Sequence, residues 1–317
     1  MNRVDMAEKL FQEGYNCSQS VVAAYSDLYG IDQEQALKLS AGFGGGIGRL
    51  REVCGAVSGM TMIAGLETGT AKKMDDEGKK YNYEVVQKLA EEFKNLSGSI
   101  ICRELLNLDA DVYTDPTPQT RTKEYYNTRP CHQLVRDAAE IIEKVLYAVS
   151  FEAVTSEEQT KKVAELAKEI WHEHYEAIIG TEQVNYMIGR FQSEAAITDQ
   201  RKNTGYEYYL LKSLGGYNGY LSFHKEENAL FLSKIYIAKR FRGRGYARKA
   251  LELLEKICRR DGLSKIWLTV NRNNISSIKT YESLGFVKSG TQVADIGEGF
   301  VMDDYIMEKL VVEEGAF

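Results

Sequence analysis

Residues 240–257 read RFRGRGYARKALELLEKI, and they follow the strand-like stretch LSKIYIA at 232–238. A helix in this region would place one set of mainly apolar residues on a single face: Ala247, Ala250, Leu251, Leu254, Ile257 and Cys258. The turn before it is Arg242-Gly243-Arg244-Gly245-Tyr246-Ala247, where the first N–H groups of a helix have no intrahelical partner. Glycines let the backbone approach an anion closely, and the helix dipole and the arginines favour negative charge. The stretch therefore predicts a phosphate-binding turn between a strand and a helix.

A second informative block, NNISSIKTYESLGF at residues 273–286, follows the strand-like KIWLTV at 265–270. Together the two blocks resemble the GNAT acetyltransferase superfamily. The first signature of that superfamily is Arg or Gln, two residues, Gly, one residue, then Gly or Ala. The second is Asn-x-x-Ala…Tyr-Glu-x-x-Gly-Phe, in which Ser277 replaces the usual alanine in this chain. The blocks occur in the expected order, separated by a strand, and the resemblance covers about residues 151–312.

The resemblance implies a mixed α/β fold with a central, mostly antiparallel, splayed sheet that binds acetyl-CoA as cosubstrate. The acetyl-CoA would lie in a V-shaped opening between the strand ending at Ile237 and the strand KIWLTV. Backbone groups would hold the pantetheine arm, the glycine-rich turn would hold the pyrophosphate, and Tyr281 would face the sulfur. The implied cofactor-binding residues are Ile235, Ile237, Arg242, Gly243, Arg244, Gly245, Tyr246, Ala247, Arg248 and Asn274.

The expected reaction is direct acetyl transfer to a primary amine, without an acyl-enzyme intermediate. An alkyl amine with a pKa of about 10.4 is charged at neutral pH, so the site must provide a base or a desolvating pocket. The segment ADIGEGFVMDDY offers four carboxylates, although solvated carboxylates at strand ends would look the same: Asp295, Glu298, Asp303 and Asp304. Tyrosine is a weaker acid than the departing thiol, so Tyr281 is expected to donate a hydrogen bond to the developing charge.

The composition limits the class of protein. With 317 residues, two domains are the expectation, and 44% hydrophobic residues suffice for well-filled cores. A net charge of −6 disfavours nucleic acid as a partner. No apolar run is long enough to span a bilayer, and the start MNRVDMAEKLFQEGYNC lacks the apolar stretch of a secretion signal. We therefore expect a cytoplasmic protein with mostly reduced cysteines, and an oligomer is possible.

The character of the chain changes at about residue 150, which predicts an all-α domain over 1–149 and the mixed α/β domain over 150–317. Helical spacing marks the stretches AEKLFQ, SQSVVAAYSDLY, EQALKLSAGF, YEVVQKLAEEFKNL and CHQLVRDAAEIIEKVLYAV. The segment 108–130 holds all three prolines and is expected to be an extended loop. In the second half, a strand at 151–154 precedes a helix capped by Thr155 and Glu158, and further strand-like stretches follow.

Four cysteines are spread over the first half: Cys17, Cys54, Cys102 and Cys131. Three of them are predicted to lie in the first turn of a helix, since Cys17 follows Asn16, Cys102 follows Ser99 and Cys131 follows Pro130. The segment Cys54-Gly-Ala-Val-Ser-Gly59 resembles the CGAxxG motif of a family of four-cysteine helical proteins to which redox activity is ascribed. The likeness covers about residues 5–145.

Three roles for these cysteines are compatible with the sequence. The resemblance implies paired thiols that cycle to disulfides. Four thiolates converging on zinc or an iron–sulfur cluster fit the number of cysteines equally well, because sequence separation does not forbid ligation. Buried structural thiols are the third alternative.

The remaining candidates are interpreted as structural. Cys258 is expected to be a packed core thiol, and His172 and His174 are expected to be ordinary packing or surface residues. The glycine-rich stretch AGFGGGIGR at 41–49 fits no dinucleotide fingerprint, so close helix approach near Cys54 is expected there, with a bound small anion or substrate as the alternative.

Two functions from different classes follow. The first is an acetyl-CoA-dependent N-acetyltransferase with a small-molecule amine acceptor, fused to a thiol redox module. The alternative is a CoA-binding regulatory module coupled to a cysteine-based metal, iron–sulfur or redox domain. The acceptor would be recognised around HEHYEAIIGTEQVNYMIGRF at 172–191, from which its chemistry is not predicted.

Overall fold

The structure is a computed structural model that describes residues 1–109 and 115–311. It divides into two compact units, Met1–Ala148 and Val149–Phe317. The helices of the first unit are α1 (Arg3–Gln12), α2 (Cys17–Tyr25), α3 (Gln33–Ser40), α4 (Gly55–Thr68), α5 (Asp76–Ser97), α6 (Cys102–Leu105), α7 (Lys123–Thr128) and α8 (Cys131–Val145), with 3₁₀ turns at Ser26–Tyr29 and Ala41–Phe43. The expected all-α character of this half is thereby confirmed.

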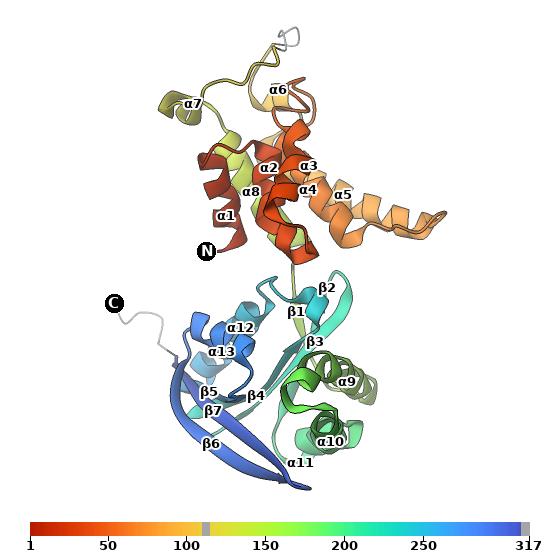
Figure 1. Ribbon diagram of the computed structural model, residues 1–317, viewed down its shortest axis with the longest axis vertical. Helices are drawn as coiled ribbons and strands as arrows, with labels where there is room; N and C mark the ends of the chain where they lie inside the picture. Colours follow the sequence, from red (N-terminus) through yellow and green to blue (C-terminus); the bar gives the residue numbers. More distant parts are fainter. Residues whose placement is uncertain (110–114, 312–317) are drawn as a thin grey trace. The chain divides into compact units, whose positions relative to one another are not determined.

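The first unit is a bundle around α2, α4 and α8. Helix α2 packs against α1, α3 and α4, and α8 packs against α1, α2, α4 and α5 (Figure 1). The bundle core includes the fully buried side chains Phe11, Val21, Met60, Leu89, Phe93 and Ile142. Burying one such side chain stabilises the fold by about 1.5–3 kcal/mol, so packing decides where these helices lie.

Two elements of this unit differ from the sequence-based expectation. Helix α4 was not predicted, because its start is rich in small residues; those residues allow close packing, and a Cβ on Gly59 would come within 2.8 Å of the Val21 side chain. Helix α7 lies inside the segment 108–130 expected to be an extended loop, of which 110–114 lie outside the described residues. The Thr122 side chain caps α7, and the Tyr126 ring packs edge-on against Phe11 at 5.9 Å.

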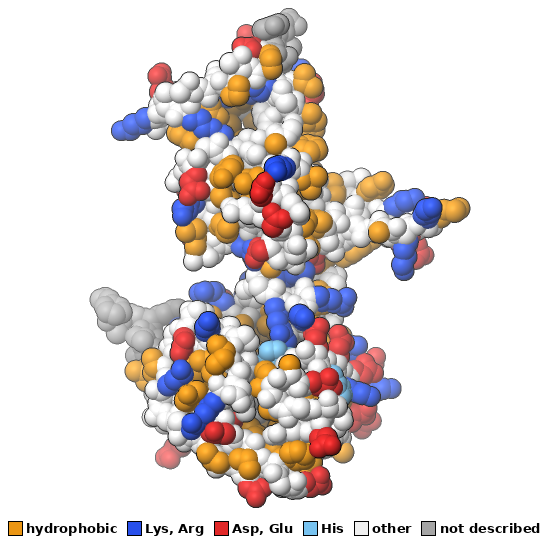
Figure 2. All heavy atoms as spheres, viewed as in Figure 1, with side chains coloured by type: hydrophobic (Ala, Val, Ile, Leu, Met, Phe, Trp, Pro, Cys, Tyr) orange, Lys and Arg blue, Asp and Glu red, His pale blue; other side chains and the backbone are white. Residues whose placement is uncertain are grey.

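The second unit is built on one seven-stranded sheet. Its elements are β1 (Ser150–Ala153), α9 (Glu157–Ile179), α10 (Thr181–Phe191), α11 (Glu194–Asn203), β2 (Glu207–Ser213), β3 (Gly216–Lys225), β4 (Ala229–Ile237), a 3₁₀ turn (Lys239–Phe241), α12 (Tyr246–Asp261), β5 (Lys265–Asn271), α13 (Ile275–Ser283), β6 (Val287–Gly297) and β7 (Phe300–Leu310). In Figure 1, α9, α10 and α11 lie on one side of the sheet and α12 and α13 on the other. On the face shown in Figure 2, charged side chains of both signs are interspersed with neutral ones.

The sheet opens between its two central strands. The strand order is β1-β2-β3-β4-β5-β7-β6, and every neighbouring pair is antiparallel except β4 and β5. Strands β4 and β5 pair only from Ala229–Lys265 to Phe231–Trp267. The register of β4 against β3 then shifts at Ser233, a bulge that bends the strand. The mixed, mostly antiparallel and splayed sheet expected from the sequence is therefore confirmed.

The helices of this unit differ from expectation in detail. The capping box of α9 is formed by Ser156 and Gln159 and not by Thr155 and Glu158, because the Gln159 side chain accepts from the backbone N–H of Ser156 at 3.1 Å. Helices α10 and α11 fill a stretch left unassigned by the sequence. The apolar face expected for α12 is buried from Ala250 to Cys258, so the interpretation of Cys258 as a core thiol is confirmed.

Candidate acetyl-transfer site and thiol cluster

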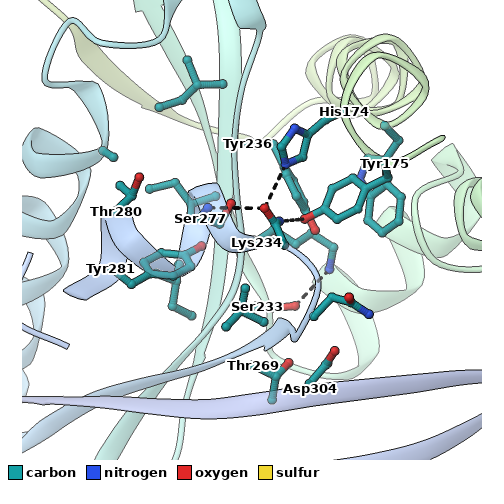
Figure 3. Close-up of a pocket in the computed structure, with 18 of the residues that line it drawn as sticks. His174, Tyr175, Ser233, Lys234, Tyr236, Thr269, Ser277, Thr280, Tyr281 and Asp304 are labelled. Atoms are coloured by element: carbon teal, nitrogen blue, oxygen red, sulfur yellow. Dashed lines mark hydrogen bonds between the residues drawn. The ribbon is translucent and has the colours of Figure 1, made fainter. Parts of the chain in front are cut away.

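A cavity of about 770 Å³ occupies the opening between β4 and β5. Its lining comes from strands β4, β5, β6 and β7, from helices α9, α10, α11 and α13, and from the first turn of α12. Figure 3 shows its interior, with Tyr281 pointing in from α13 and Asp304 beside Thr269. The sheet topology therefore places the glycine-rich turn and the second sequence block around one cavity.

The glycine-rich turn has the backbone geometry that an anion site requires. Gly243 and Gly245 have φ angles of +77° and +76°, which only glycine adopts without strain. Gly245 is also the N-cap of α12, and its carbonyl accepts the first helical hydrogen bond from Lys249 at 3.1 Å. The first turn of α12 lies at the cavity wall, where the positive end of the helix dipole favours an anion.

Nine of the ten predicted cofactor-binding residues line this cavity: Ile235, Ile237, Arg242, Gly243, Gly245, Tyr246, Ala247, Arg248 and Asn274. Arg244 does not, since it is buried with its guanidinium 5.0 Å from the centre of the Phe241 ring. Arg242 donates from Nε to the Ile237 carbonyl at 2.9 Å, which fixes the turn to the end of β4.

A histidine that the sequence interpretation treated as ordinary packing connects the turn to α13. The Arg242 guanidinium lies 3.2 Å from His174 Nδ1, and His174 Nε2 lies 3.3 Å from Asn274 Oδ1. Burial and the charge of Arg242 lower the pKa of His174, so a neutral ring that accepts at Nδ1 and donates at Nε2 satisfies both contacts. Asn274 Oδ1 in turn accepts from the N–H of Ser277 at 3.3 Å and caps α13. His172, by contrast, contacts Glu176 at 2.7 Å outside the cavity.

His174 could have been found from spacing on α9. It lies three residues after the buried Trp171, and Tyr175 stacks on Trp171 at a centroid distance of 4.5 Å. Residues three and four apart share one face of a helix, so this face of α9 turns toward the sheet and the cavity.

Only one of the four acidic candidates lies in the cavity. Asp304 on β7 is buried, and burial raises the pKa of its carboxyl to about 6, although a hydrogen bond with Thr269 opposes this shift. Among the described residues its Oδ1 atom has no hydrogen-bond partner. The other three lie outside the cavity: Asp303 pairs with Arg272 at 2.6 Å, Asp295 accepts from the N–H of Gly297, and Glu298 occupies the β6–β7 turn.

A buried lysine also lines the cavity and was not assigned a role from the sequence. Lys234 on β4 is 6% exposed and donates from Nζ to Gln200 Oε1 at 2.9 Å and to Ser233 Oγ at 3.2 Å. Its Nζ lies 5.2 Å from the ring centres of both Tyr206 and Tyr208. Burial lowers the pKa of Lys234 to about 7. In the sequence Lys234 alternates with Leu230 and Leu232, but this spacing does not predict its position, because the strand bulges at Ser233 and Lys234 pairs with Ser222.

Tyr281 on α13 also lines the cavity. Burial raises the pKa of its hydroxyl well above its usual range. A phenol of that kind stays protonated, so its hydroxyl is available as a hydrogen-bond donor.

The four cysteines of the first unit each begin a helix. Cys17, Cys102 and Cys131 are the first residues of α2, α6 and α8, as expected, and Cys54 is the N-cap of α4. A single β-bridge between Val53 and Ile101 joins two of these starts. Through it the N–H of Cys54 donates to the Ile100 carbonyl at 2.8 Å and that of Cys102 to the Glu52 carbonyl at 2.6 Å.

Glycines near Cys54 make this convergence possible. Gly46 has a φ of +72°, and a Cβ on it would lie 2.6 Å from Cys102 Cβ and 2.8 Å from the Glu52 nitrogen. A Cβ on Gly55 would lie 3.2 Å from Cys17 Cβ. The close approach expected for this glycine-rich region is confirmed.

Gly46→Ala is therefore expected to destabilise the helical unit by roughly 2–4 kcal/mol, through left-handed backbone strain together with a clash against backbone that cannot move aside. Gly42→Ala is the matched control in the same stretch, because nothing lies within 4 Å of a Cβ there and no positive φ is required; a change below about 0.5 kcal/mol is expected. Far-UV circular dichroism during denaturation measures both. Equal stabilities of the two variants would contradict the packing described.

The thiols differ in their ionisation. Cys17 and Cys131 interact through a side-chain hydrogen bond, which raises the pKa of Cys17 and lowers that of Cys131 to about 7. Burial raises the pKa of Cys54 to about 12 and also raises that of Cys102.

All four cysteines of the first unit are free thiols. Within residues 1–109 and 115–311, no group of three or more Cys, His, Asp or Glu side chains is arranged to hold a metal ion.

Comparison with known proteins matches each unit to a family model. Residues 15–145 match the model described as "Putative redox-active protein (C_GCAxxG_C_C)", and residues 161–286 match "Acetyltransferase (GNAT) family". The two resemblances inferred from the sequence are thereby confirmed. No curated protein is significantly similar to the chain. None of the helices in the described residues has the length and apolarity needed to cross a membrane.

Solved structures similar to the chain correspond to about half of its length. A PaiA N-acetyltransferase from Thermoplasma acidophilum, solved in complex with coenzyme A, is 21% identical, with 51% of this chain and 99% of that chain covered and a TM-score of 0.41. A GNAT-family acetyltransferase from Streptococcus pneumoniae is 19% identical, covering 52% and 100%, with a TM-score of 0.39. A spermidine N-acetyltransferase from Vibrio cholerae is 18% identical, covering 51% and 93%, with a TM-score of 0.38.

Proposed function

We propose that the C-terminal unit is an acetyl-CoA-dependent N-acetyltransferase that transfers the acetyl group directly to a primary amine of a small molecule. The observation that carries this proposal is the shared cavity: the N–H groups that begin α12 and the buried carboxylate of Asp304 line the same opening. An anion site alone would favour a binding module. A base with a pKa near neutrality in the same cavity favours catalysis.

Coenzyme A would be held by the glycine-rich turn and the split sheet. The first N–H groups of α12 and the Arg242 and Arg248 side chains can bind the pyrophosphate. The His174 contacts to Arg242 and Asn274 fix this turn relative to α13, which carries Tyr281. These residues therefore suit a phosphate-bearing thioester.

Asp304 is the proposed base for the acceptor amine. Its pKa of about 6 leaves it ionised at pH 7, and its Oδ1 is unpartnered among the described residues. It can therefore attract an ammonium group and accept its proton before or during attack on the thioester carbonyl. The Tyr281 hydroxyl can donate a hydrogen bond to the charge that develops on the departing sulfur.

The test is turnover by the full chain with acetyl-CoA and a panel of primary amines, in which mass spectrometry measures the acetylated amine. The panel is run twice, once with the cysteines reduced and once with them oxidised. Formation of an acetylated amine together with one equivalent of free coenzyme A is expected. Coenzyme A binding without turnover across the panel would favour the alternative, a regulatory module. Failure of coenzyme A to bind would overturn the enzymatic proposal.

We propose in addition that the N-terminal unit is a thiol redox module. The convergence of four free cysteines at helix starts supports this function, because neighbouring thiols can pair as disulfides and the lowered pKa of Cys131 supplies a thiolate near neutral pH. Buried structural thiols, by contrast, would remain reduced after mild oxidation, which a thiol titration measures.

A further inference from the structure

Two of the four cysteines form a pair that differs chemically from the other two. Cys17 and Cys131 are the first residues of α2 and α8, two helices that pack against each other, and the two thiols interact. Cys131 is 8% exposed, and Cys17 is more exposed. Two adjacent thiols of which one donates to the other have the arrangement of a nucleophile and its resolving partner.

The groups that face Cys131 favour its thiolate. Its pKa is lowered first by the hydrogen bond from Cys17 and then by three arginines, Arg129, Arg121 and Arg51, while burial opposes the shift. Tyr125, Cys54 and Cys102 also interact electrostatically with the Cys17–Cys131 pair. A thiolate is the reactive form of cysteine, and a thiol whose pKa is near the ambient pH is the most effective attacking group.

In the part of the chain that the structure describes, acidic side chains do not neutralise these arginines, of which Arg121 and Arg129 are partly exposed and Arg51 is buried. Within the described residues, none of Arg51, Arg121 and Arg129 takes part in a salt bridge. Arg121 donates to the Phe11 carbonyl at 2.9 Å and lies 4.5 Å from the centre of its ring, and Arg129 lies 4.9 Å from that of Tyr125. Neutral partners therefore hold these guanidinium groups, and their charge remains available to an anion.

We propose that Cys131 is the nucleophile of a thiol–disulfide exchange centre, that Cys17 is its resolving partner, and that its substrate is a small disulfide bearing carboxylate groups. This inference rests on the redox half of the proposed function and is independent of acetyl transfer. The Cys131 thiolate attacks one sulfur of the substrate, breaking its S–S bond and releasing the other sulfur as a thiolate. Cys17 then loses its proton and attacks Cys131, and the second substrate thiolate leaves. The substrate is reduced to two thiols, and Cys17 and Cys131 are oxidised to one disulfide.

The experiment uses the full reduced chain with oxidised glutathione, an anionic disulfide, and with cystamine, a cationic one. After acid quenching and alkylation, peptide mass mapping locates each disulfide. The wild-type protein is expected to form the Cys17–Cys131 disulfide first and to release two glutathione thiols. The C17S variant is expected to stop with glutathione attached to Cys131. Cys258, buried in the other unit, serves as an internal control and should remain a thiol.

The charge preference is tested in the same assay. Oxidised glutathione is expected to react at least about tenfold faster than cystamine at low salt, with the ratio falling in Arg129→Gln and at high ionic strength. Attachment of glutathione to Cys54 or Cys102 in C17S, or equal rates for the two disulfides, would overturn the proposal. If C17S does not fold, the first disulfide mapped in the wild-type protein decides the pairing. Loss of acetyl-transfer activity changes none of these readouts.

Discussion

Replacing Asp304 with asparagine is expected to lower kcat/KM for acetyl transfer by about 100-fold or more, the usual contribution of a positioned general base. The asparagine side chain has the size of the aspartate side chain but cannot accept the proton of the acceptor amine. In the wild-type protein, kcat/KM should rise with pH through about 6, because Asp304 must be ionised to act and its pKa is about 6. The variant should lose this acidic limb of the profile.

The same substitution is expected to stabilise the protein. The pKa of Asp304 is raised by burial, so the folded state binds more protons than the unfolded state between about pH 4 and pH 6, and stability falls as pH rises through that window. Above it, the ionised carboxylate destabilises the fold by about 1–3 kcal/mol. Lower activity combined with higher stability would distinguish loss of a base from general damage to the site.

Asp303→Asn is the matched control, since Asp303 precedes Asp304 on β7 but is exposed and pairs with Arg272 at 2.6 Å. A change of less than about twofold in kcat/KM is expected, because exposed ion pairs contribute little to a buried reaction centre. A full acidic limb in D304N, or an equal loss of activity in D303N, would remove Asp304 from the role of base.

The sequence predicted the part of the cavity proposed to hold coenzyme A better than the part proposed to hold the acceptor amine. The turn from Arg242 to Ala247 follows from local rules: glycines at positive φ, a helix start and charged neighbours. Such features depend on a few adjacent residues. Arg244 shows the limit of local reasoning, because its side chain is buried against Phe241 and does not reach the cavity.

The part of the cavity proposed to hold the acceptor amine is formed by residues that only tertiary packing brings together. Asp304 could not be separated from Asp303 by sequence, because neighbouring residues of a strand point to opposite faces and the burial of each face is decided by the sheet. The role of His174 likewise required α9 to be placed against the glycine-rich turn and α13. The burial of Lys234 likewise depends on the bulge at Ser233 and on the packing of Gln200 and Tyr208 against its ammonium group, which the sequence does not show.

The fold was predicted at the level of class and order, and a helix such as α4 was missed for a physical reason. Helix α4 contains Gly55, Gly59 and Gly65, and isolated helix propensity is low at glycine. In the structure Gly59 packs against Val21, so close contact with α2 compensates for the weak propensity. A pattern search that relies on large apolar residues does not detect a helix that packs through small ones.

Replacing Lys234 with methionine is expected to stabilise the C-terminal unit most near pH 7 and progressively less as the pH rises toward 10. The folded-state pKa of Lys234 is lowered to about 7 by burial, whereas an unfolded lysine has a pKa of about 10.4. Between these values the unfolded state binds one proton more than the folded state, so wild-type stability rises by about 1.4 kcal/mol per pH unit from this group. Methionine removes that dependence and has a similar shape. The substitution also leaves Gln200 Oε1 a partner, because the Tyr208 hydroxyl donates to the same atom.

Urea denaturation followed by tryptophan fluorescence measures this effect for one unit alone, since both tryptophans, Trp171 and Trp267, lie in the C-terminal unit. The difference between K234M and the wild type should be several kcal/mol near pH 7 and close to zero at about pH 10. Lys279→Met is the control, because Lys279 is exposed on α13 and its replacement should shift stability by less than about 0.5 kcal/mol at every pH. A difference for K234M that does not change between pH 7 and pH 10 would show that Lys234 stays charged in the folded protein. Gln200, Ser233 and the two tyrosine rings would then hold a buried ammonium group. The Lys234 side chain would face the acceptor as a cation and not as a neutral amine.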